Sequence, residues 1–266
     1  MSKKLKIAVI TQNDVYAIPR NFKLLCDAEE LNIAELIVIN AAGSLENKRM
    51  LFLRGFGFYQ ATKMASVTLF YQLRSLFASL MRSPKIAHWL NLKGLCTRYD
   101  IPFRKEQDVN SEKLLERLKA SELDVIVSFS APTVFKSKLL NLPRYGCINL
   151  HCSSLPSYSG VLPSFWVLLN NEKKAGLSVH IMDSKIDNGA VLGQEEVDIS
   201  SMDNMFDVIQ ATKIRGGHLM LTVLRYLHKN RCLPNPLNTS HNKHSYFSWP
   251  KVEDLKILVA QGKRLI

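Results

Sequence analysis

The chain has 266 residues, 47% of them hydrophobic and 22% charged, enough for one large domain with a sizeable core. No apolar run reaches the roughly 18 residues of a membrane-spanning helix, and the run at 7–10 is too short for a signal peptide. The cysteines are odd in number, widely spaced and without a CxxC pair, which argues against a disulfide framework and a structural zinc site. We therefore expect a cytoplasmic protein.

The net charge of +12 is unevenly distributed along the chain. Residues 48–99 contain nine Lys and Arg and no Asp or Glu, so this segment carries +9 of the total. The rest of the chain carries only +3. The basic character is local, which indicates a basic surface on one part of the molecule.

Apolar runs and helical patterns alternate along the first two thirds of the chain. The expected strands are 5–11, 34–40, 124–130, 146–150 and 176–182, and the expected helices are about 20–30 and 111–120. Asn110 or Ser111 can cap the second helix. This alternation predicts a Rossmann-like α/β fold with a mostly parallel sheet and helices on both faces.

The last third of the chain does not continue this alternation of strands and helices. Residues 203–229 predict one long helix or two, interrupted at Gly216 and Gly217, and 234–242 is rich in turn residues. A short amphipathic helix is expected after Pro250. We divide the chain into a catalytic domain at 1–229, with a helical insertion at about 46–99, and a C-terminal tail at 230–266 that ends in a helix.

The basic insertion contains an amphipathic helical pattern. Polar residues fall on one side of a helical wheel (Thr68, Gln72, Ser75, Ser79 and Arg82) and apolar residues on the other (Phe70, Leu73, Phe77 and Leu80). With basic flanks and no acid, the helix could bind an anionic membrane or a partner protein. We favour the plainer interpretation that its apolar face covers this domain's own sheet or a homodimer interface, because any crossover helix needs one apolar face.

Polar residues stand where two of the expected strands end, the place where α/β sheets bind ligands. Asn149 and His151 flank Leu150, so strand alternation directs both to the same face. Asp187 lies in a turn that Gly189 allows to double back. If the two turns meet, an amide that stabilises an oxyanion, an imidazole that moves a proton and a carboxylate that orients it share one cleft, which suits acyl transfer to an amine.

Each of these residues also has a structural interpretation. A His at a strand end is more often a satisfied, partly buried residue, and an Asp before Gly usually only forms a turn. His180, in the middle of a strand, is expected to be structural, and Cys152 is not expected to be a nucleophile. The residue types alone leave both interpretations open.

The segment from Tyr145 to Gln194 resembles the folate-dependent formyltransferases, among them the glycinamide ribonucleotide, methionyl-tRNA and nucleotide-sugar enzymes. The shared elements occur here in the same order: Asn149 and His151, Leu155-Pro156 and Gly160, Trp166, Ser178 to His180, and Asp187 with Gly189 and Gln194. The resemblance departs at Cys152, usually a Pro, and at Ser159, usually a basic residue. The second departure weakens any transfer of the relatives' substrate contacts to this chain.

This resemblance implies an N-formyltransferase that uses 10-formyltetrahydrofolate as formyl donor and needs no metal. It implies that Asn149, His151 and Asp187 are the catalytic residues. The donor's pteridine would bind at the loop of Thr133, Val134 and Phe135 and at the turn from Lys185 to Asp187.

The acceptor amine is the least determined part of this prediction. The turn after the first strand has no glycine, which disfavours a glycinamide ribonucleotide. The chain leaves only about 35 residues after Lys229, where tRNA formyltransferases carry a further domain, so we expect a nucleotide-linked amino sugar of surface polysaccharide synthesis. A methionyl-tRNA formyltransferase-like enzyme ranks second although a basic surface favours RNA, and a nucleic-acid partner is not expected.

Two further alternatives stay open. If the basic helix faces a membrane, the acceptor could be a lipid-linked amine and the protein could be peripheral to the inner membrane face. The chain could also be a folate-binding or membrane-binding module without turnover.

Overall fold

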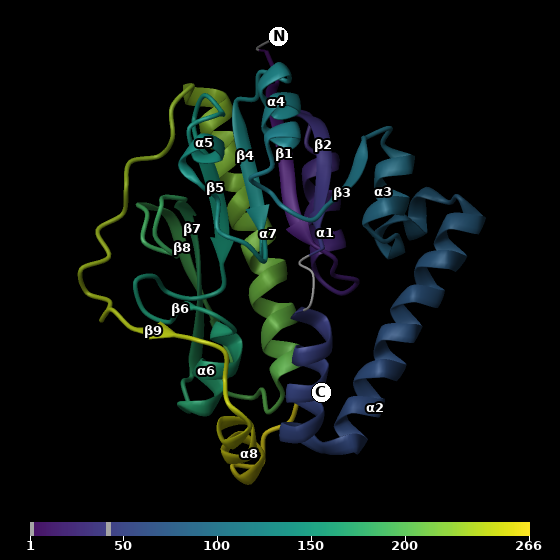
Figure 1. Ribbon diagram of the computed structural model, residues 1–266, viewed down its shortest axis with the longest axis vertical. Helices are drawn as coiled ribbons and strands as arrows, with labels where there is room; N and C mark the ends of the chain where they lie inside the picture. Colours follow the sequence, from purple (N-terminus) through teal and green to yellow (C-terminus); the bar gives the residue numbers. More distant parts are fainter. Residues whose placement is uncertain (1–2, 41–43) are drawn as a thin grey trace.

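The computed structural model describes residues 3–40 and 44–266 and has a seven-stranded sheet at its centre (Figure 1). Its strands are β1 (Leu5–Gln12), β2 (Leu31–Ile39), β3 (Phe103–Glu106), β4 (Val125–Phe129), β5 (Cys147–His151), β7 (Lys174–Ile181) and β8 (Val191–Asp198). Their spatial order is β3-β2-β1-β4-β5-β7-β8. The β3-β2-β1-β4-β5 part is parallel, while β7 and β8 join antiparallel, which confirms the predicted mostly parallel sheet.

Two strands of the seven-stranded sheet are absent from the prediction, and they form its two edges. β3 is only four residues long, and three of the four, Arg104 to Glu106, are charged. β8 carries three acidic residues, Glu195, Glu196 and Asp198, which are partly or fully exposed. An edge strand needs little apolar sequence because part of it faces water, so the apolar runs that mark the central strands are absent.

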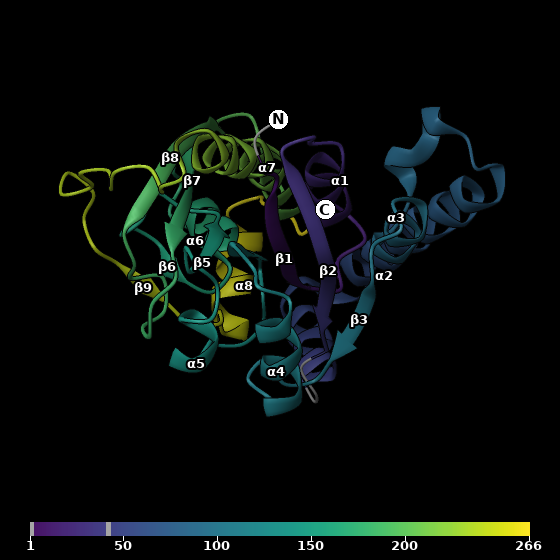
Figure 2. The ribbon, with the colours of Figure 1, turned by 90° about the horizontal axis from the view of Figure 1, so that it is seen from above.

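Helices cover both faces of the sheet (Figure 2). The helices of the described residues are α1 (Ile18–Cys26), α2 (Ser44–Met81), α3 (Leu92–Arg98), α4 (Glu112–Ala120), α5 (Ser137–Leu140), α6 (Pro163–Leu169), α7 (Met205–Asn230) and α8 (Val252–Ala260), with a 3-10 helix η1 at Pro84–Trp89. Neighbouring residues of β1 contact helices on opposite faces of the sheet. Val9 packs with α1 and α7, whereas Ile10 packs with α4 and α5.

The helix predicted at 203–229 is a single helix, α7, and is not interrupted by its two glycines. A Cβ on Gly216 would lie 2.6 Å from the side chain of Leu150, and one on Gly217 would lie 2.3 Å from the Asn21 side chain. The glycines are therefore explained by close packing of α7 against β5 and α1 and not by a break in the helix.

Local details of two predicted helices also differ. The first helix, α1, ends at Cys26 and not near residue 30, because β2 already begins at Leu31. Ser111 is the N-cap residue of α4, but its side chain makes no capping hydrogen bond. Asn110 instead ties down the loop after β4, donating to the carbonyl of Val134 and accepting from the amide of Lys136.

The insertion is helical, as predicted, but α2 does not turn its apolar side toward this domain's sheet; the alternative of a homodimer interface stays a prediction. It bends at Gly57, whose φ is 82°, and its long second part runs along the outside of the molecule toward α3 (Figure 1). Thr68 bonds the Tyr16 hydroxyl and Ser75 Oγ accepts from the amide of Asn91, so these two residues of the polar side face the protein, while Gln72, Ser79 and Arg82 are exposed. The expectation that the apolar side covers this domain's own sheet is wrong.

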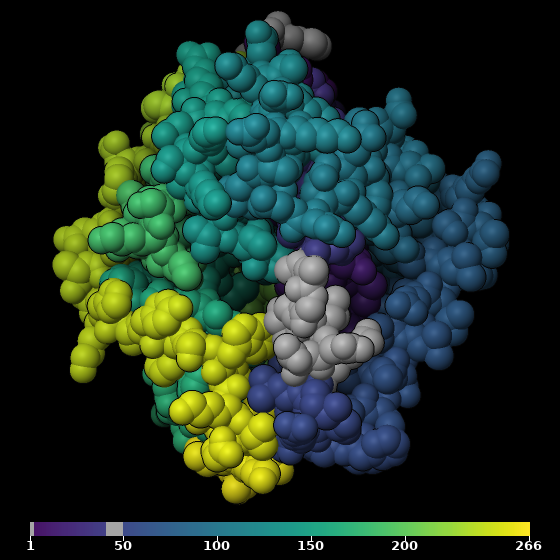
Figure 3. All heavy atoms as spheres, viewed as in Figure 1, coloured from purple at the N-terminus to yellow at the C-terminus, as the bar shows by residue number. Residues whose placement is uncertain are grey.

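The C-terminal segment returns to the body of the protein. β9 (Tyr246–Phe247) pairs with β6 (Ser159–Gly160), and the buried Leu255 of α8 lies against Gly55 of α2, where a Cβ would approach within 2.2 Å. Figure 3 shows this segment beside the N-terminal part of α2. The division into 1–229 and 230–266 stays a prediction.

Within the described ranges, no helix combines the length and the apolar character needed to cross a bilayer.

Candidate active site

The structure brings Asn149, His151 and Asp187 into one cluster, together with His180. Asn149 and His151 are at the carboxyl end of β5, and β7 places His180 directly opposite Asn149. Asp187 Oδ2 lies 3.5 Å from His151 Nδ1, and its Oδ1 lies 3.7 Å from His180 Nε2. The predicted convergence of the two turns is therefore present in the structure.

His180 holds the Asn149 amide. Its Nδ1 lies 2.8 Å from the Ile181 carbonyl, to which a proton on Nδ1 can be donated. Its Nε2 is then free to accept from Asn149 Nδ2 at 3.2 Å. Burial lowers the pKa of His180; Asp187 works against this shift and the His151 charge adds to it, so the neutral ring that can accept this bond is favoured.

His151 faces oxygen atoms on both sides. Its Nε2 lies 3.0 Å from the Tyr158 carbonyl, and its Nδ1 faces Asp187. A proton on each ring nitrogen would have an acceptor, so the site can accommodate the imidazolium as well as the neutral ring.

The turn that carries Asp187 is held by backbone geometry. Asp187 has a φ of 50°, and its Oδ2 accepts a hydrogen bond of 2.8 Å from the amide of Gly160. At Gly189 a Cβ would lie 1.8 Å from the Ile181 carbonyl oxygen, so only glycine lets the chain return this closely to β7. The carboxylate is thus fixed by two separate loops.

Side chains of the neighbouring strands hold the loop after β5. The buried Ser178 donates to the carbonyl of Ser153 and accepts from the amide of Leu155. Gln194 of β8 donates to the carbonyl of Leu155, and its own amide oxygen accepts from Asn242. The peptide bond before Pro156 is cis. The loop that receives the His151 hydrogen bond is therefore anchored to β7, β8 and the C-terminal segment.

An aromatic stack packs at the loop after β5. The Phe247 ring lies between Tyr158 and Trp166, with ring centroids 5.2 and 4.7 Å away. Trp166 Nε1 donates to the Val161 carbonyl. This stack connects α6, the β5 loop and β9, so the C-terminal segment helps to support the site.

A cavity of about 190 Å³ lies beside the cluster and provides space for a small ligand. Its lining includes Asp187 with the rest of its turn, Pro156, Leu237 and His244. The carboxylate that faces His151 therefore also borders an open space.

The residues of the loop predicted to bind the folate differ in their exposure. Phe135 is buried in the core, so its side chain is not available to a ligand, whereas Val134 is 51% exposed. Thr133 Oγ1 is buried without a hydrogen-bond partner among the described residues. In the other predicted segment, Lys185 is exposed, and its amide donates to Asp183.

Cys152 points away from the cluster, as alternation after His151 requires. Burial raises the pKa of its thiol, and nearby Lys213 counteracts this only in part. Beside it, Lys213 Nζ lies 3.0 Å from Asp14 Oδ2, an ion pair that joins the loop after β1 to α7. The raised pKa argues against Cys152 as a nucleophile.

Sequence reasoning missed the position of His180. Its place in a G-x-S-V-H strand was visible, but only the antiparallel pairing of β7 with β5 shows that it faces Asn149. Among the described residues, no group of three or more His, Cys, Asp or Glu side chains forms a metal site.

The fold and the cluster define an α/β protein whose site offers an amide, an imidazole and a carboxylate at the end of a parallel strand. Residues 81–224 match the family model described as formyl transferase. Because this match covers more than half of the chain, the chain belongs to the formyl transferase family, which uses 10-formyltetrahydrofolate as formyl donor.

Individual relatives agree with this family. A methionyl-tRNA formyltransferase of Trichormus variabilis is 31% identical over 146 residues, which cover 54% of this chain and 44% of that protein. The chain spans about half the length of the curated relatives it matches.

Solved structures resemble the fold over most of its length. A sugar N-formyltransferase from Shewanella sp. has a TM-score of 0.58 at 17% identity, covering 96% of this chain and 86% of that one. An N-formyltransferase from Helicobacter canadensis, solved with folinic acid and dTDP-3-aminofucose, has a TM-score of 0.56 at 17% identity, with 96% and 78% covered. At this identity the likeness concerns the fold.

Proposed function

We propose that the protein transfers the formyl group of 10-formyltetrahydrofolate to the primary amine of a nucleotide-linked amino sugar. The observation that carries this proposal is the cluster of Asn149, His151 and Asp187 at the end of β5. Family membership supports the reaction class, and the fold's likeness to sugar N-formyltransferases over 96% of the chain supports the acceptor.

The residues of the predicted folate pocket fit such a donor. The hydroxyl of Thr133, which has no hydrogen-bond partner among the described residues, offers a polar group to a heterocycle with several hydrogen-bond donors and acceptors, and the exposed Val134 follows it in the chain. Lys185 and Asp187 belong to the turn that would form the opposite wall. When bound, the donor supplies the formyl group.

Each residue of the cluster has a defined task in this proposal. Asn149 directs one amide hydrogen to His180 and keeps the second for an oxyanion that develops on the reacting carbon. His151, with both nitrogens facing oxygen acceptors, adds positive charge beside that oxyanion when it is protonated. Asp187 orients His151 and, at the edge of the cavity, accepts the proton that the attacking amine loses, directly or through water.

The reaction is tested by substituting the cluster. Asn149→Ala and His151→Ala should each lower kcat/KM by about a hundredfold, the usual scale for oxyanion and proton-transfer groups. Release of tetrahydrofolate in the presence of the amine measures turnover, and circular dichroism checks that both variants fold. Full activity in both variants would reject the assignment, and binding of folate without turnover of any amine would favour a binding module.

The acceptor needs a separate experiment, because the chain also resembles methionyl-tRNA formyltransferases in sequence. We would incubate the protein with the formyl donor and a panel of nucleotide-linked amino sugars, lipid-linked amines and charged initiator tRNA. A mass increase of one formyl group identifies the acceptor. Transfer to the tRNA alone would replace the sugar proposal, and the outward apolar face of α2 is the reason for including the lipid-linked amines.

A further inference from the structure

The long part of α2 exposes an apolar face that the rest of the protein does not cover. Large side chains recur every three or four residues and are at least half exposed: Leu69, Phe70, Leu73, Leu76, Phe77 and Leu80, with Leu80 at 73%. Ser75 and Ala78, on the other side of the same helix, are buried. A folded monomer rarely exposes so many large apolar side chains in one stripe, so this face has a binding role.

Positive charge flanks both ends of this face. Arg54 and Lys63 precede it, and Arg82 and Lys85 follow it, all exposed. Residues 48–99 contain no acidic residue, and none of the described Lys and Arg side chains in this segment forms an ion pair with a described Asp or Glu, although Lys63 Nζ donates to the main-chain oxygen of Ile266. A partner for this surface must therefore combine apolar groups with negative charge.

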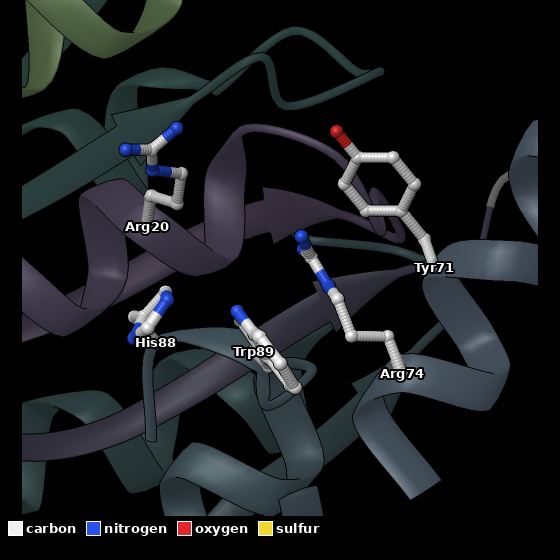
Figure 4. Close-up of a pocket in the computed structure, with 5 residues that line it drawn as sticks. All are labelled: Arg20, Tyr71, Arg74, His88 and Trp89. Carbon is white, nitrogen blue, oxygen red and sulfur yellow. The ribbon is translucent and has the colours of Figure 1, made fainter. Parts of the chain in front are cut away.

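A cationic cavity of about 180 Å³ lies at the edge of the apolar face (Figure 4). Arg74 and Tyr71 project from α2, His88 and Trp89 from η1 and Arg20 from α1. Two ring contacts link its lining to the apolar face: Phe70 with Tyr71 at 6.0 Å and Phe77 with Trp89 at 6.4 Å.

The cavity holds two guanidinium groups without a described carboxylate beside them. Arg74 lies over the Tyr71 ring at 4.3 Å, and its buried Nε has no hydrogen-bond partner among the described residues. Burial lowers the pKa of Arg74 and the charge of Arg20 adds to this shift, although Tyr71 opposes it. A phosphate between the two arginines would supply the missing acceptor and relieve their repulsion.

We propose that the outward face of α2 docks on the surface of an anionic lipid bilayer, with the Arg20 and Arg74 cavity at its edge receiving a lipid phosphate. The large apolar side chains would enter the headgroup region while the basic flanks contact anionic lipids. Charge decides against a second copy of this chain, because a twofold contact would bring two segments of +9 together without an acidic residue between them. This inference does not depend on formyl transfer.

The apolar face is tested by vesicle flotation of the full-length protein with Leu80→Glu and, as matched control, Ser79→Glu. Both positions are exposed and adjacent, but only Leu80 belongs to the apolar face. The wild type should bind phosphatidylglycerol vesicles more tightly than phosphatidylcholine vesicles, and less tightly as salt rises. Leu80→Glu should weaken binding at least about tenfold and Ser79→Glu much less.

Equal losses in the two variants would overturn the insertion of the apolar face, because only the added charge would then matter. No binding of the wild type to anionic vesicles would overturn the proposal altogether. A stable dimer in light scattering that Leu80→Glu converts to monomers would assign the face to a second copy instead. Thermal melts of both variants show whether they fold.

The cavity has its own comparison, Arg74→Gln against Arg82→Gln, each of which removes one charge from the same segment. If a lipid phosphate occupies the cavity, Arg74→Gln weakens binding to phosphatidylglycerol vesicles several-fold more than Arg82→Gln. Equal effects would show that the cavity takes no lipid phosphate. Binding of inorganic phosphate that Arg74→Gln abolishes, with unchanged vesicle binding, would assign the cavity to a free phosphate.

Discussion

At the scale of single residues, the candidate site depends on one buried histidine, His180, for which the sequence predicts a structural role but no contact with Asn149. His180 accepts the Asn149 amide only while its ring is neutral, and its pKa is lowered mainly by burial. The strand register that sets this contact joins residues 31 positions apart. Alternation predicted which face Asn149 takes, but no local pattern predicts which residue faces it from the next strand.

We expect this histidine to make stability dependent on pH. Its ordinary pKa is 6.5 and the folded value is lower, so between the two values the unfolded chain binds more protons than the folded one. The free energy of unfolding should therefore rise with pH through this window and level off above about 6.5. His180→Gln, which retains a hydrogen-bond acceptor but does not titrate, should reduce the rise. Urea unfolding from about pH 5 to pH 8 measures it, and equal pH profiles for both proteins would contradict the prediction.

A second prediction concerns the turn of Asp187. A methyl group at Gly189 would collide with the Ile181 carbonyl, so Gly189→Ala should displace the turn and reduce activity by at least about tenfold. Gly262→Ala is a control without a collision, because nothing lies within 4 Å of the added methyl group, although the φ of 78° at Gly262 itself disfavours alanine. Release of tetrahydrofolate measures activity and a thermal melt measures stability, so a loss of activity can be distinguished from a loss of folding. Comparable activity in both variants would show that the turn tolerates the shift.

At the scale of elements, polar contacts position the parts that carry the site. The largely buried pair of Asp14 and Lys213 joins the loop after β1 to α7. Burial tends to raise the pKa of Asp14, but Lys213 and backbone amides outweigh it, and the net pKa is lowered. Strands and helices were predictable from apolar periodicity, whereas this pair joins residues 199 positions apart and follows only from how α7 crosses the sheet.

Removing one member of this pair should be costly. Lys213→Met leaves a buried carboxylate without its partner and should reduce the free energy of unfolding by about 3–5 kcal/mol. The double variant Asp14→Asn with Lys213→Met should recover part of that loss. Lys174→Met, which breaks an exposed pair with Glu196, should change little. Urea unfolding measures all three, and similar losses in the Lys213 and Lys174 variants would refute the expected contrast.

At the scale of the whole molecule, the C-terminal segment packs into the body of the protein. Leu255 and Leu258 of α8 are fully buried, and the backbone around Arg264 bonds to Asp203 and Met205. A division at residue 229 would separate these contacts. In the sequence, the helical pattern ends at about that point and a segment rich in turn residues follows. Contacts between distant segments, however, decide whether the two parts unfold together.

We expect one cooperative unit. Leu258→Ala should lower the stability of the whole chain by about 2–5 kcal/mol, because it leaves a cavity between α8 and its neighbours. The adjacent Ile257 is 51% exposed, and Ile257→Ala serves as control with a small expected effect. Calorimetry measures both. A separate low-temperature transition that alone responds to Leu258→Ala would show that the tail is an independent unit.

The α/β architecture, the five central strands and the candidate residues Asn149, His151 and Asp187 can be predicted from the sequence. These features follow from apolar periodicity and from motifs read along the chain, which are local properties. The contact of His180 with Asn149, the unbroken course of α7 past its glycines and the outward apolar side of α2 depend on packing between distant segments. An amphipathic pattern gives a helix two different faces, but only packing against neighbouring elements decides which of them the protein covers.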